Sequence, residues 1–128
     1  MRRLLLLVLS VTLLWSGAAF AATLQVAQGV ITTQVVNRMP VDEIQNYAAS
    51  VGKLYCFTRI VGATEDTSVT HVWMLNDHEV ARVTLPVRSS DWRTWSSKTI
   101  PADAKGQWQV KVLDARGDIL KTIKFTLK

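Results

Sequence analysis

The sequence predicts an all-β fold, an immunoglobulin-like antiparallel β-sandwich of about seven strands with one short helical connector. Runs rich in Val, Ile, Thr and aromatic residues recur along the chain, with turn signals roughly every eight to twelve residues. Residues 107–112 alternate apolar and polar side chains without a break. Antibody-type domains have a Cys on the second strand and a Trp on the third strand, and Cys56 and Trp73 occur in the same order here.

Residues 1–21 are expected to be a secretory signal peptide. Met1-Arg2-Arg3 is basic, residues 4–15 are apolar, and Ala19-Phe20-Ala21 supplies small residues for cleavage. The alternative is an uncleaved anchor, but the apolar run is shorter than the roughly 20 residues that a spanning helix needs. Cleavage near Ala21 predicts a periplasmic or secreted protein with a single β-sandwich domain, residues 22–128, and no span left after cleavage.

The first strand is expected within residues 24–37, which are rich in Val, Ile and Thr. Gly29 is expected to mark a bulge, and Pro40 to close the segment. Residues 42–51 form the helical candidate, since apolar side chains recur there at i, i+3, i+4 and i+7. Asp42 is expected to cap its start.

The remaining strands follow as β-rich runs separated by polar turns. They are expected at residues 53–61, 69–75, 80–87, 92–100, 107–112 and 122–128. Asn and Asp in 76–79 favour a tight hairpin turn, because both tolerate a positive φ. The turn at 114–118 is expected to place Gly117 in the left-handed region.

Cys56 is the one cysteine of the chain, so no intramolecular disulfide can form. A free cysteine is among the most often buried residues, and Cys56 is therefore expected in the core. The position of the second cysteine of antibody-type domains would fall on the penultimate strand, where Val110 or Val112 stands instead.

Charge argues against a nucleic-acid partner. The full chain carries 15 basic and 10 acidic side chains, and removing 21 residues with two arginines from 128 leaves 107 residues of net charge +3. Nucleic-acid-binding domains usually carry a much stronger basic stripe. The basic residues near the C-terminus are Lys121, Lys124 and Lys128, which suit protection of an edge strand or proximity to anionic polymers.

Neither an enzyme nor a metal site is predicted. His71 and His78 are tied by no motif to Ser96, Ser97 or Cys56, as a hydrolytic triad would require. Met39 and Met74 complete the residue types of a copper site but not its spacing. No cofactor is expected.

Trp92, Arg93 and Trp95 form the candidate ligand-binding cluster, and His71 is added to it. Trp rings stack on sugars, and Arg bonds carboxylates in a bidentate manner. On a regular strand, Trp92 and Trp95 face opposite sides, so at most one is expected at the surface unless Trp92 belongs to the preceding turn. The alternative is that one or both rings complete the core.

Four segments of the sequence resemble a family of exported bacterial domains of unknown function, family 2914. They are His71-Val72-Trp73, residues 92–96, residues 106–110 and the turn 114–117, and the resemblance extends from about residue 37 to Phe125. It implies export and a sandwich fold, and it carries over no activity or catalytic residue.

These observations lead to one expected function and one alternative. The expected function is an exported, non-enzymatic accessory or adaptor domain of the bacterial cell envelope that makes protein–protein contacts. The alternative is a polysaccharide- or peptidoglycan-binding module that uses Trp92, Arg93 and Trp95.

Overall fold

The computed structural model describes residues 10–12 and 23–128. Apart from residues 10–12, the expected signal peptide lies outside the described residues, and so does Ala21, where cleavage is predicted. The 3₁₀ turn at Ala49–Val51 is the longest helical element of the described residues, and it is far too short to cross a membrane.

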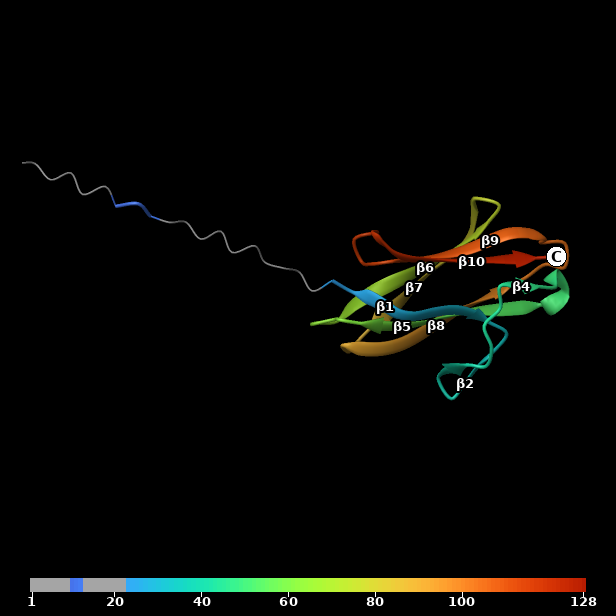
Figure 1. Cartoon of the computed structure of the whole chain (residues 1–128), viewed down its shortest axis with the longest axis horizontal. Coiled ribbons are helices and arrows are strands. Elements are labelled where there is room, and N and C mark those ends of the chain that lie inside the picture. The colour runs from blue at the N-terminus through green and yellow to red at the C-terminus, as the bar shows by residue number, and fades with distance from the viewer. Residues whose placement is uncertain (1–9, 13–22) are drawn as a thin grey trace, which may run out of the picture.

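Two antiparallel sheets form the body of the protein and lie in two layers (Figure 1). One sheet has the strand order β1–β5–β8, and the other has the order β4–β10–β9–β6–β7. The strands are β1 (Gln25–Thr32), β2 (Val35–Val36), β3 (Met39–Pro40), β4 (Asn46–Tyr47), β5 (Lys53–Val61), β6 (Thr67–Leu75), β7 (His78–Val87), β8 (Asp91–Thr99), β9 (Gly106–Leu113) and β10 (Ile119–Leu127). The predicted all-β fold is confirmed.

The described residues contain ten strands, whereas about seven were expected. Seven of the ten have eight to ten residues, and β2, β3 and β4 have two residues each. Such short strands leave no pattern of alternation in a sequence. The seven long strands follow the immunoglobulin-like arrangement, with β5, β6 and β9 where antibody-type domains have their second, third and sixth strands.

The centre of the sandwich is packed where the disulfide of an antibody domain would lie. Cys56 on β5, Trp73 on β6 and Val110 on β9 are all completely buried in one apolar cluster. Cys56 is a free thiol, and burial raises its pKa. The prediction that Cys56 occupies a core position is confirmed.

The N-terminal strand prediction needs two corrections. β1 ends at Thr32, and residues 35–40 form a separate hairpin, β2–β3, which projects from the three-stranded sheet on the side away from the five-stranded sheet (Figure 1). The register shift in β1 lies between Val26 and Gln28, one residue before the bulge expected at Gly29. A Cβ at Gly29 would lie 3.0 Å from Cδ1 of Ile123, so this glycine permits the close approach of β10.

The helix predicted at residues 42–51 is wrong. Asn46 and Tyr47 pair in parallel with β10 as β4, and helical structure is confined to the 3₁₀ turn. Asp42 caps no helix, because its carboxylate instead accepts hydrogen bonds from the backbone N–H of Thr33 (2.8 Å) and from the hydroxyls of Thr32 (2.6 Å) and Thr33. Backbone pairing with β10 therefore overrides a weak helical period.

The two turn predictions in the second half of the chain are confirmed. Asn76 and Asp77 have φ values of 47° and 67° and join β6 to β7 directly. Gly117 has a φ of 90° in the turn between β9 and β10. A short connection with suitable residues is a local property, and the sequence therefore predicts it well.

Candidate functional site

The candidate tryptophans lie on β8, which is the outer strand of the three-stranded sheet. Trp92 is paired with Ile60, and Trp95 with Phe57. Trp92 packs against the buried cluster that contains Ile60, whereas the Trp95 ring stacks on Phe57 on the other face of the sheet, with ring centroids 6.3 Å apart. The prediction of opposite faces therefore agrees with the strand register.

Both tryptophans nevertheless border one open depression. Its volume is about 320 Å³, and it is lined by Arg38, Pro86, Trp92, Arg93, Thr94 and Trp95. Each Trp is half-buried. The expectation that at most one ring reaches the surface is thus wrong. No strand of the described residues pairs with the outer side of β8, and rings from both of its faces are partly exposed there.

Arg38 closes the depression from a distant part of the sequence. It stands in the turn of the β2–β3 hairpin, where Asn37 and Arg38 both have positive φ values, 52° and 60°. Its guanidinium carbon lies 5.9 Å from the centroid of the Trp92 ring, a distance typical of a cation–π contact. The hairpin therefore brings a cation to the aromatic surface of β8.

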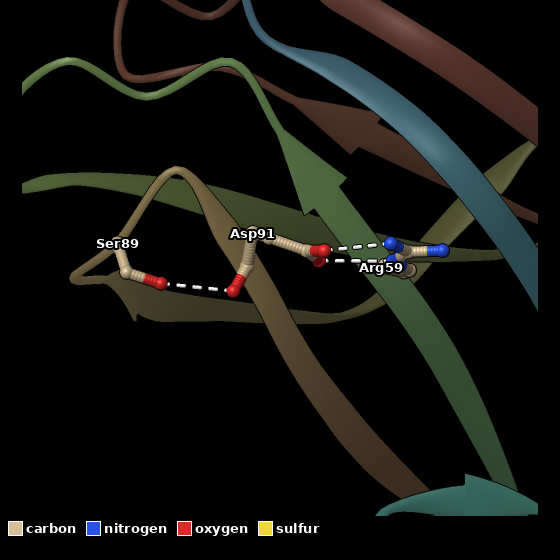
Figure 2. Close-up of polar contacts among 3 residues, drawn as sticks. All are labelled: Arg59, Ser89 and Asp91. Carbon is tan, nitrogen blue, oxygen red and sulfur yellow. Dashed lines mark hydrogen bonds and ion pairs between the residues drawn. The ribbon is translucent and has the colours of Figure 1, made fainter.

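One acidic residue lies next to these arginines, and it is already paired. Asp91 accepts two hydrogen bonds from Arg59, from Nε at 2.9 Å and from Nη2 at 2.6 Å (Figure 2). Hydrogen bonding to Arg59 holds the pKa of Asp91 below its usual value. Ser89 donates to the backbone oxygen of Asp91 at 2.8 Å, which fixes the turn before β8 (Figure 2).

His71 lies in the core and does not line the depression. Its Nδ1 is 2.7 Å from the Ser96 hydroxyl, and its Nε2 is 3.1 Å from the Thr58 hydroxyl. Trp73 donates to Ser96 at 3.1 Å, and Thr58 donates to the backbone oxygen of Thr94 at 2.9 Å. This set of buried groups, here called the His71 network, links the two sheets.

The directions of these bonds follow from Thr58 and from the neutral form of His71. Thr58 gives its single proton to the Thr94 carbonyl, and its oxygen therefore accepts the Nε2–H of His71. Burial lowers the pKa of His71 to about 4, so the ring is neutral and carries no second proton on Nδ1. Nδ1 therefore accepts from the Ser96 hydroxyl, whose oxygen in turn accepts the indole N–H of Trp73.

A family match covers much of the second half of the chain. Residues 66–127, which are 62 of the 128 residues, match the family described as a protein of unknown function, DUF2914. These matched residues are here called the DUF2914 segment. No curated protein matches the chain. The DUF2914 segment starts just before β6 and ends in β10, so it includes His71 and the β8 tryptophans. The matched segment is shorter than the resemblance expected from the sequence, which began near residue 37.

The pair of Ser96 and His71 in the DUF2914 segment has the spacing of a nucleophile and its base. A hydrolytic site also needs an acid to orient the histidine, and here Thr58 occupies that place. Both Ser96 and His71 are buried. The bond between Ser96 and His71 joins β8 of one sheet to β6 of the other. Among residues 10–12 and 23–128, no three His, Cys, Asp or Glu side chains gather as a metal site would require.

Sequence reasoning missed Arg38 and Pro86 as parts of the depression. Arg38 precedes the DUF2914 segment, and nothing in the local sequence links the hairpin turn to β8. The sequence did contain one turn pattern, because the polar dipeptide Asn37-Arg38 lies between Val35-Val36 and Met39-Pro40. That signal predicts a turn but not the strand that the turn approaches.

Proposed function

We propose that this protein is an exported, non-enzymatic domain of the bacterial envelope that binds a saccharide in the depression beside β8. The supporting observation is that two half-exposed Trp rings and two arginines border one open depression. Trp rings bind the apolar faces of sugar rings, and Arg side chains donate to sugar oxygens. The burial of His71 and Ser96 favours a binding role over a catalytic one.

The test of this proposal is binding to purified peptidoglycan and envelope polysaccharides. We expect the protein to sediment with at least one of these glycans, and Trp95→Ala to weaken binding by about tenfold, the effect of losing an aromatic contact of ~1.4 kcal/mol. Tyr47→Ala is the matched control, because Tyr47 is an aromatic residue exposed on β4, in the other sheet. Equal binding by both variants, or no binding by the wild type, would refute the proposal.

Export has its own measurement. We expect osmotic shock to release the protein from the periplasm, with a mass that corresponds to a chain starting at residue 22. A chain of full-length mass in the cytoplasmic fraction would contradict the proposed location.

A protein-binding role is the second candidate, and one observation favours it. Val36, Met39 and Val41 on or beside the β2–β3 hairpin are all large apolar residues that are more than 40 % exposed. Exposed apolar patches commonly mark protein contacts. Met39→Gln with Val41→Gln is expected to abolish co-purification of an envelope protein if the hairpin is the contact, because these changes remove apolar surface and add no charge beside Arg38.

A further inference from the structure

The depression beside β8 holds more positive than negative charge. Arg38 and Arg93 line the aromatic depression, and both also line an adjoining depression of about 270 Å³ together with Asp91. Both arginines therefore border each of the two depressions.

Asp91 offsets only part of this positive charge. Both of its carboxylate oxygens accept from the Arg59 guanidinium, and hydrogen bonding to Arg59 together with the nearby charge of Arg93 lowers the pKa of Asp91. Within residues 10–12 and 23–128, neither Arg38 nor Arg93 forms an ion pair with any carboxylate. The site thus has three arginines, Arg38, Arg59 and Arg93, against one carboxylate, beside an aromatic surface.

This combination sets two requirements on a ligand. One part must be apolar and flat enough to cover a Trp ring, as the C–H face of a pyranose is. The other must be an anion that accepts bidentate hydrogen bonds from a guanidinium, as carboxylate and phosphate do. A sugar that bears an acidic group meets both requirements.

Arg38 and Trp92 supply these requirements from different parts of the chain. The aromatic residues lie in the DUF2914 segment, whereas Arg38 precedes it and is carried by the hairpin. The hairpin is held at its base by Asp42, which binds Thr32 and Thr33. Preference for an acidic ligand therefore depends on a residue outside the matched family segment.

We infer that the depression beside β8 selects saccharides that carry an acidic group, and that Arg38 and Arg93 bind that group while Trp92 and Trp95 contact the sugar ring. This inference rests on the proposed saccharide-binding function. It adds the charge of the ligand and gives Arg38 the role of a specificity-determining residue.

The experiment compares three probes by isothermal titration with the purified protein: trigalacturonate, the neutral galactose trimer and tripolyphosphate. We expect trigalacturonate to bind at least about tenfold more tightly than either of the others, the effect of one charge-assisted contact. Raising the salt concentration should weaken its binding.

Charge-removing variants locate the effect. Arg38→Gln and Arg93→Gln are each expected to reduce trigalacturonate affinity about tenfold more than they reduce galactose-trimer affinity. Arg116→Gln is the matched control, since Arg116 is an exposed arginine in the turn between β9 and β10. Its affinity for both trimers should equal that of the wild type.

The possible results separate the inference from the proposed function. Equal affinity for the two trimers would overturn the inference and leave saccharide binding standing. Tripolyphosphate binding as tight as trigalacturonate binding would overturn the inference in favour of a general anion site. Failure of both trimers, and of envelope polysaccharides, would overturn the proposed function itself. If both arginine variants still prefer trigalacturonate over the galactose trimer as strongly as the wild type does, Arg38 and Arg93 do not bind the acidic group.

Discussion

Ser96→Ala tests whether the His71 network holds the two sheets together. Ser96 accepts the indole N–H of Trp73 and donates to Nδ1 of His71, so removal of its hydroxyl leaves one donor and one acceptor unpaired in the core. The described residues contain no buried side-chain N or O atom without a partner, so the wild type carries no comparable defect there.

The magnitude follows from these two orphaned groups. A buried polar group without a partner costs about 1–3 kcal/mol, and two groups of one network do not add fully. We therefore expect the free energy of unfolding to fall by about 3 kcal/mol. For a domain with a urea m-value of about 1.5 kcal/mol/M, this loss lowers the unfolding midpoint by about 2 M.

Ser97→Ala is the matched control, because Ser97 is the next residue of β8 and is exposed. An exposed serine-to-alanine change usually alters stability by less than about 0.5 kcal/mol. Urea unfolding is followed by Trp fluorescence for the wild type and both variants, and the m-values should agree. If Ser96→Ala and Ser97→Ala unfold at the same urea concentration, the inferred role of the network is wrong.

Four further predictions concern His71, Cys56 and Asp42. Burial lowers the pKa of His71 from an ordinary 6.5 to about 4, so we expect the free energy of unfolding to fall by about 3 kcal/mol as the pH is lowered from 6.5 to 4. In urea titrations over this pH range, His71→Gln should lose less stability than the wild type does. Long-range ¹⁵N–¹H spectra should show the Nε2–H tautomer of His71 from pH 8 to pH 5, and a titrating signal would contradict it. Because burial raises the pKa of the Cys56 thiol, we expect no reaction with a thiol reagent at pH 8 before unfolding and full reaction in urea, whereas equal rates in both would contradict the burial. Asp42→Ala should speed tryptic cleavage after Arg38 severalfold by releasing the hairpin, with Asp118→Ala as the control; unchanged cleavage would show that Asp42 does not hold it.

The second half of the fold could be predicted from sequence because its determinants are local. Residues 107–112 of β9 and 122–127 of β10 alternate apolar and polar side chains, and each hairpin turn contains residues that favour a positive φ, such as Asn76 and Gly117. The region between β1 and β5 could not, because its elements depend on distant partners. Asn46 and Tyr47 form a strand only because β10 offers a free edge, and β1 ends where the Asp42 carboxylate binds Thr32.

The candidate site shows the same division. Trp92, Arg93 and Trp95 share one short segment, and they lie together in the structure as the sequence suggested. Their exposure could not be predicted, because period-two alternation gives the face of a sheet and not the position of the strand within it. The position of His71 in the core, away from these three residues, could not be predicted either. Its neighbours Thr58 and Ser96 lie on another sheet, and only their register shows that its nitrogens are already paired.

β8 thus divides binding and stability between alternating residues of a single strand. Thr94 and Ser96 take part in the His71 network, Thr94 through its backbone oxygen and Ser96 through its hydroxyl. Arg93 and Trp95 point outward to the depression. Trp92 points inward but lies at the open end of the strand, so it serves both the core and the depression. Substitution of Arg93 should therefore change binding without changing stability, and substitution of Ser96 should do the reverse. Substitution of Trp92 should change both, and this makes Trp92 the least informative of the candidate residues to test alone.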